Sequence, residues 1–154
     1  MRLRLIAVGT RMPDWVQRGV AEYVERLPRE FAFTLDEVKP VPRKAPSPAA
    51  IAEEGARVLA RLPRDAHVVL LDERGSGWTT PQFAARLSEW QGSHAEVALL
   101  VGGADGHADT VRALAKERWS LSPLTLPHAL VRVVLAEQLY RAVSVLRGHP
   151  YHRP

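Results

Sequence analysis

Two short apolar runs constrain the fold of this chain more than any other feature. They are HVVLLD at 67–72 and EVALLV at 96–101, and neither alternates apolar with polar residues as a half-exposed strand does. Continuous apolar runs of this length are typical of strands that helices cover on both faces. We therefore expect a sheet that is buried on both sides.

Segments with a helical apolar period separate the expected strands. The strands are expected at 2–9, 31–39, 67–72, 96–101 and 119–121, and the helices at 14–27, 48–62, 81–91, from the glycine turn to about 117, and at 128–147. Ser47 and either Thr79 or Thr80 are expected N-caps. Regular alternation of strand and helix predicts an α/β fold with a mostly parallel sheet. With 154 residues and no repeat or composition shift, residues 1–154 are predicted to form one domain.

Composition excludes several classes of site. The chain has no cysteine, which excludes disulfides, thiolate zinc sites and a cysteine nucleophile. No apolar run reaches the roughly 18 residues that a membrane span needs, so we expect a cytoplasmic protein with no membrane partner. His149 and His152 have no carboxylate nearby in sequence, and no metal is expected. Both ends of the chain are basic, which fits a nucleic-acid partner and an ordinary, mildly basic protein about equally well.

The segment SLSPLTLPH at 120–128 is neither a helix nor a paired central strand. Pro123 and Pro127 lack the backbone N–H that both structures need. We expect a stiff ribbon that exposes amides and carbonyls while its leucines stay buried. Such a ribbon suits a pocket that recognises a flat heterocycle by main-chain hydrogen bonds.

The glycine turn VGGADG at 101–106 follows the fourth expected strand. Its G-G-x-x-G spacing differs from the dinucleotide fingerprint, which follows a first strand. Asp105 and Asp109 are expected at the N-terminus of the next helix, where they would repel a pyrophosphate. The alternative is a tight turn with Asp105 as a helix cap. Because the turns after Asp72, Gly103 and Leu121 all follow strands, we expect them to line one pocket suited to a nucleoside that carries a cation.

The end of the chain combines an apolar helix with a polar tail. The helix at 128–147 is apolar around most of its circumference, which predicts one face against the sheet and another against a second copy of the chain. The tail HPYHRP at 149–154 has the aromatic, imidazole and guanidinium groups that stack on bases and hold phosphates. A frayed terminus is the alternative.

Five blocks along the chain carry a family resemblance. They are LIAVGTRMPDWVQRGVAEY, LLDERG, VGGADG, WSLSPLTLPHALVRVVLAEQLYRA and HPYHRP. Through them the chain closely resembles the bacterial methyltransferases of the SPOUT class that modify N3 of a pseudouridine in large-subunit ribosomal RNA. The resemblance implies S-adenosylmethionine as methyl donor, a homodimer, ribosomal RNA or the assembled ribosome as substrate, and a C-terminal trefoil knot that contains the last helix.

The resemblance also implies site residues. Those expected to bind the donor are Leu71, Gly102, Gly103, Ser122, Pro123, Leu124, Thr125, Leu126 and Pro127. His128 is the expected base for the imino proton, with His152, from the same or the partner subunit, as the alternative. Arg132 and Arg153 are expected to hold RNA phosphate, and Tyr151 to stack on or orient the target base. The alternatives are purely structural roles, in which His128 caps the last helix and Arg132 neutralises Glu137 or an acid of the partner.

Two departures and three other functions accompany this hypothesis. The glycine turn has Ala104 and Asp105 where the family commonly has proline and glutamate, which keeps the charge, and the basic loop at 40–48 is given no role.

Methylation of another RNA atom, such as a ribose hydroxyl or a tRNA base, is one alternative. A ribosome-binding protein without catalysis is another, and an oxidoreductase is a third that rests only on the glycine turn.

Overall fold

The computed structural model describes residues 1–153, which build one five-stranded sheet with the strand order β2-β1-β4-β3-β5. The strands are β1 (Arg2–Val8), β2 (Ala32–Val38), β3 (His67–Gly77), β4 (Glu96–Val101) and β5 (Glu117–Ser120). Every neighbouring pair is parallel. The predicted α/β fold with a parallel sheet is confirmed.

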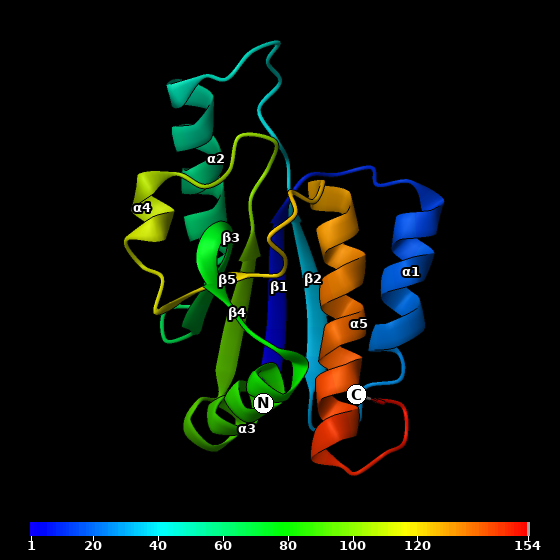
Figure 1. The fold of residues 1–154 in the computed structure, drawn as a ribbon. Helices are drawn as coiled ribbons and strands as arrows, with labels where there is room; N and C mark the ends of the chain where they lie inside the picture. Colours follow the sequence, from blue (N-terminus) through cyan, green and yellow to red (C-terminus); the bar gives the residue numbers. More distant parts are fainter. Residues whose placement is uncertain (154) are drawn as a thin grey trace.

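Helices cover the sheet on both faces (Figure 1). They are α1 (Asp14–Val24), α2 (Pro48–Arg61), α3 (Thr80–Ser93), α4 (Asp109–Arg112) and α5 (His128–Leu146). Leu3, Leu5 and Ala7 of β1 pack in the core cluster that includes α3 and α5. Ile6 and Val8 pack in the cluster that includes α2 and α4. The strands are therefore buried on both sides, as their apolar runs predicted.

Helix starts follow the expected capping residues. The Ser47 hydroxyl accepts the amide hydrogen of Ala50, and Thr79 with Gln82 forms a capping box at the start of α3. No helix among residues 1–153 is long and apolar enough to cross a membrane.

The region between β4 and α5 differs from the expectation. The helix expected to reach about residue 117 is the single turn α4. The amide of Lys116 donates to the carbonyl of Val68, so strand pairing starts there and ends the helix early. The last strand lies at Glu117–Ser120, two residues before the expected start, and β3 runs on to Gly77 after a register shift between Leu71 and Ser76.

Parallel strands bring their carboxyl ends to one edge of the sheet, which lies at the top of Figure 1. The loops after β1, β2 and β4 and the segment before α5 meet at this edge. The tail after α5 lies at the opposite end of that helix.

Candidate active site

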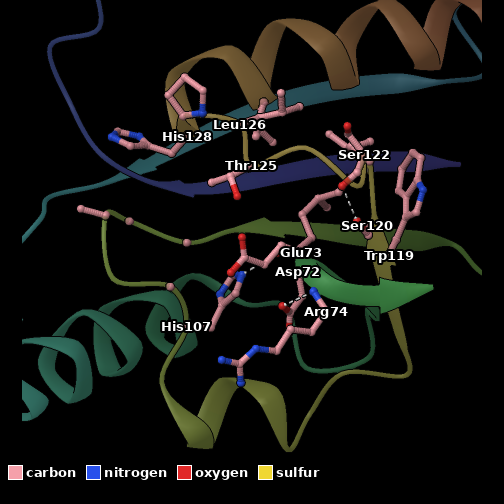
Figure 2. Close-up of a pocket in the computed structure, with 18 of the residues that line it drawn as sticks. Asp72, Glu73, Arg74, His107, Trp119, Ser120, Ser122, Thr125, Leu126 and His128 are labelled. Carbon is pink, nitrogen blue, oxygen red and sulfur yellow. Dashed lines mark hydrogen bonds between the residues drawn. The ribbon is translucent and has the colours of Figure 1, made fainter. Parts of the chain in front are cut away.

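A cavity of about 740 Å³ lies where these loops meet, and we call it the main cavity. It is lined by residues 71–74 of β3, by the glycine turn with His107, and by the ribbon that leads into α5. Figure 2 shows Asp72, Arg74 and His107 on one side and Ser122, Thr125 and Leu126 on the other. The three turns expected to share a pocket therefore do so.

Serine side chains shape the ribbon. The Ser120 hydroxyl donates to the carbonyl of Ser122 over 2.9 Å, and the Ser122 hydroxyl accepts the amide hydrogen of Leu124, also over 2.9 Å. These local bonds replace a strand or helix ladder. The expectation that the leucines of the ribbon stay buried is wrong for Leu124, whose surface is 73% exposed. Leu121 and Leu126 are half-buried.

Nearly all residues expected to bind a donor line the main cavity. They are Leu71, Gly102, Gly103, Ser122, Leu124, Thr125, Leu126 and Pro127. Pro123 is not among the lining residues. Gly102 allows the turn to close on itself, because a Cβ at this position would lie 2.9 Å from the carbonyl carbon of Gly106.

Charged residues that were given no individual role from the sequence also line this cavity. Asp72, Glu73, Arg74 and Arg112 lie at its β3 and α4 side. Asp72 accepts the amide hydrogen of Arg74 over 3.0 Å, and its other oxygen is 3.9 Å from the Arg112 guanidinium. The LLDERG block contained the first three of these residues, but nothing in the sequence placed α4 beside them.

His107 is a further residue that was missed. Its ring is buried, and its Nε2 lies 3.0 Å from the carbonyl oxygen of Leu71. Burial lowers the pKa of His107, so the neutral ring donates its Nε2 hydrogen to that carbonyl. His107 thereby fixes the end of β3 that forms the cavity wall. Its position directly after the glycine turn was the available signal.

His128 begins α5 and lines the main cavity at its edge. Figure 2 shows its ring turned away from Ser122 and the rest of the ribbon. Burial, and then the positive charge of Arg132, lower the pKa of His128, so the ring is neutral at pH 7. Its Nδ1 is buried and has no hydrogen-bond partner within residues 1–153. The alternative role as a helix cap is wrong, because Pro127 is the N-cap residue of α5 and no side chain bonds there.

Arg132 does not lie where RNA could reach it in this chain. Only 1% of its surface is exposed. Its guanidinium donates to Glu37 over 2.5 Å and to the carbonyl of Gly9 over 2.9 Å. The expected contact with RNA phosphate is therefore corrected to a buried ion pair that joins α5 to β1 and β2. The proposed partner Glu137 instead accepts from Arg141.

Tyr151 of the tail packs against the second half of α5, so the chain is not frayed at this residue. The Tyr151 hydroxyl donates to Glu137 over 3.1 Å, and its ring meets Tyr140 edge-on with centroids 4.6 Å apart. Burial and Glu137 raise the pKa of Tyr151 to about 12. None of Tyr151, His152 and Arg153 lines the main cavity of the same chain.

Asp105 in the glycine turn has a different partner from the one expected. It accepts from Arg43 of the 40–47 loop over 2.7 Å, whereas α4 has no side-chain cap. Arg43 also donates to Glu54, a buried carboxylate of α2, over 2.7 Å. The two carboxylates raise the pKa of the Arg43 guanidinium. The loop that was given no role therefore holds the glycine turn in place.

The described residues, 1–153, contain no group of three or more His, Asp or Glu side chains placed to hold a metal ion.

Comparisons with known proteins agree over the whole chain. A family described as predicted SPOUT methyltransferases matches residues 1–152. The chain is 56% identical to ribosomal RNA large subunit methyltransferase H of Thioalkalivibrio sulfidiphilus and 53% identical to the protein of that name from Hahella chejuensis, in each case over 99% of both chains. Among solved structures, a probable methyltransferase from Bordetella pertussis shares the fold, with a TM-score of 0.55 at 16% identity over 92% of this chain and 96% of that one.

Proposed function

The chain belongs to the SPOUT methyltransferase family, and we propose that it transfers the methyl group of S-adenosylmethionine to N3 of a pseudouridine in large-subunit ribosomal RNA, in the cytoplasm and on the assembled ribosome. Membership of this family implies the C-terminal trefoil knot that the resemblance suggested. The observation that carries the proposal is the main cavity, where eight of the nine expected donor-binding residues meet.

The walls of the main cavity suit the methyl donor chemically. The ribbon offers peptide groups to an adenine ring, and its prolines fix their direction. Glu73 forms no salt bridge within residues 1–153, and it places negative charge at the cavity, which favours a sulfonium cation and disfavours a pyrophosphate. Arg74 and Arg112 offer positive charge for the carboxylate of the methionine part.

Methyl transfer needs alignment and removal of one proton. The bond from the methyl carbon to sulfur breaks as the bond to N3 forms, which leaves a thioether and a methylated nitrogen. The N3 proton passes to the neutral imidazole of His128. Holding both reactants in line accounts for up to roughly 7–11 kcal/mol of the barrier reduction.

A homodimer would bring the tail to the site. Tyr151 contacts Tyr140, which lies about 18 Å along the helix axis from His128 at 1.5 Å per residue. We infer that Tyr151, His152 and Arg153 act at the main cavity of the partner subunit. Trp15 of α1 and Leu146 of α5 are large apolar residues with 52% and 40% of their surfaces exposed, which a second copy of the chain would cover.

Single-turnover methylation of ribosomes with isotopically labelled donor tests the function. We expect one methylated pseudouridine, with the label on N3, and faster reaction with intact ribosomes than with naked RNA. A label on a ribose hydroxyl or on tRNA would favour the alternative acceptors. Absence of heat on titration with S-adenosylmethionine would favour a ribosome-binding protein without catalysis.

The residue roles are tested in the same assay. His128→Ala is expected to slow methyl transfer by roughly 10²–10⁴-fold, the usual contribution of a general base. Deletion of residues 150–154 is expected to slow the reaction as well. Affinity for S-adenosylhomocysteine should be unchanged in both variants, and unchanged rates would remove these assignments.

A further inference from the structure

A second cavity of about 400 Å³ opens beside the main cavity, and we call it the side cavity. It lies between the end of β1 with the loop that follows, the 40–46 part of the loop after β2, and the glycine turn. Its volume is in the range of sites that hold small organic molecules. Of the nine residues expected to bind the donor, only Gly103, on the wall shared with the main cavity, lines it.

The two cavities share a wall. Gly103, Ala104, Asp105 and His128 line both of them. Ligands that filled the two cavities would therefore approach each other across the glycine turn and the first residue of α5. This is the arrangement that direct transfer between two bound molecules requires.

The ring of His128 lies toward the side cavity. Its Cε1 would be 3.4 Å from a Cβ on Gly9, which lies at the end of β1 in the wall of that cavity. Gly9 has φ +141°, a conformation that side chains rarely adopt, and a Cβ there would lie 3.0 Å from the Arg132 guanidinium. The base proposed for the N3 proton therefore lies against the side cavity rather than in the depth of the main cavity.

The rim of the side cavity is basic. Lys44 is exposed and lines the cavity, and Arg11 is exposed between the lining residues Thr10 and Met12. Arg11 has φ +56°, the one non-glycine residue with positive φ in the described chain. Neither side chain forms a salt bridge within residues 1–153. Both charges are therefore available to an anionic partner.

A buried network fixes the outer wall. Arg43 donates to Glu54 and to Asp105, each over 2.7 Å, and Glu54 also accepts the amide hydrogen of Val41 over 2.9 Å. The network ties the loop after β2 to α2 and to the shared wall. It also neutralises Arg43, so the positive charge of the cavity is confined to its rim.

We propose that the side cavity receives the target nucleotide, with its uracil-type base against His128 and the glycine turn and its phosphates on Arg11 and Lys44. The inference rests on the proposed function and adds the place of the acceptor. A base held there has its imino nitrogen near the neutral imidazole and across the shared wall from the donor. A nucleotide that leaves its stack to enter a pocket is the usual substrate form for enzymes that modify bases.

Filling the side cavity tests the proposal. Ala45→Trp and Thr10→Trp place a large ring in it from opposite walls, and neither residue lines the main cavity. Ala52→Trp, on an exposed position of α2 that lines neither cavity, is the matched control. We expect both filled variants to bind S-adenosylhomocysteine like the unmodified protein and to methylate ribosomes about 100-fold more slowly in a single turnover. The control should react at the unmodified rate.

Two outcomes would overturn the placement of the target nucleotide in the side cavity without overturning the proposed function. Filled variants that methylate ribosomes at the unmodified rate would show that the base binds elsewhere, and loss of donor affinity in both would show that the rings act on the main cavity. If the unmodified protein binds donor but methylates no ribosome, the proposed function itself fails. In addition, Arg11→Gln and Lys44→Gln should each lower the slope of log affinity for ribosomes against log salt by about one.

Discussion

The main cavity and the side cavity lie at the same edge of the sheet but are built by different contacts. The ribbon of the main cavity is shaped by bonds between residues two positions apart, from Ser120 to Ser122 and from Leu124 to Ser122. The side cavity is lined by Arg43 and Asp105, an ion pair between residues 62 positions apart, and by Gly9, whose carbonyl accepts from Arg132, 123 positions away. The ribbon wall of the main cavity is therefore set by local backbone chemistry. The side cavity is set by contacts between distant residues, which form only in the folded chain.

Among the changes that compare the walls of the two cavities, the largest effect is expected from a side chain that disturbs the glycine turn of the main cavity. In Gly102→Val the new Cβ would meet the backbone of Gly106, which cannot yield as a side chain can. Overpacking of this kind costs about 1–3 kcal/mol. The turn therefore shifts to relieve the contact, and a donor that requires the original turn has to restore it, so donor binding is expected to weaken by up to roughly 150-fold. Calorimetry with S-adenosylhomocysteine measures this, with Gly92→Val, which meets nothing within 4 Å, as the control. Unchanged affinity would show that the turn is not part of the donor site.

A smaller effect, on the free energy of unfolding, is expected from breaking the ion pair between Arg132 and Glu37. Glu37→Gln leaves the charged Arg132 buried with the Gly9 carbonyl and a neutral amide. We expect a loss of about 2 kcal/mol in the free energy of unfolding, less than for a fully buried pair because 38% of the Glu37 side chain is exposed. Urea unfolding measures it. Glu53→Gln, in an exposed pair with Arg57, should cost under about 0.5 kcal/mol, and equal losses would contradict the comparison.

The next effect is a pH dependence of the methylation rate that comes from His128, which lines both cavities. Because the pKa of His128 lies below its ordinary 6.5, the ring is neutral at pH 7 and protonated only in more acidic solution. The single-turnover rate should be level near neutrality and fall about tenfold per pH unit below that pKa, since a protonated ring accepts no proton. Glu37→Gln removes the negative charge beside Arg132, so the positive charge of Arg132 lowers the pKa of His128 further. The fall in rate should therefore move to lower pH. A rate that stays level through the pH range in which NMR shows the His128 ring to take up its proton would exclude His128 as the base.

The smallest effect concerns one hydrogen bond of the ribbon. Ser122→Ala removes the acceptor of the Leu124 amide. The bond contributes about 0.5–1.5 kcal/mol to the order of the ribbon, and because the donor has to restore that order on binding, its affinity is expected to fall by up to roughly 10-fold. Ser93→Ala at the exposed end of α3 is the control. Weakening of equal size in both would mean that the ribbon does not depend on this bond.

The same contrast explains which parts of the site could be predicted from the sequence. The prolines at 123 and 127 exclude a helix and a central strand wherever they occur, so the ribbon was predictable. The unalternating runs of β3 and β4 indicated a sheet covered on both faces for a similarly local reason. The partner of Arg132 was not predictable, because its place on α5 does not reveal that it meets β2.

Long-range contacts also explain the remaining errors. The segment after Asp109 has helical propensity, but pairing of β5 with β3 ends α4 after one turn. An aspartate at a glycine turn before a helix is a typical N-cap, so the sequence predicts that role for Asp105. In the folded chain Asp105 accepts from Arg43 instead. Arg43 in a proline-rich loop resembles a solvated charge in sequence, and only its two carboxylate partners show that it holds a wall.

The all-parallel sheet has a consequence for synthesis of the chain. No strand pairs with its neighbour through a hairpin, so every ladder waits for a long crossover to close. β1 pairs with β4, whose register matches Arg2 with Glu96. At about 5–20 residues per second, β1 leaves the ribosome roughly 5–20 s before this partner exists. During that interval Leu3 and Leu5 lack the α3 and α5 residues of their core cluster, so this apolar surface of the nascent chain is open to chaperones.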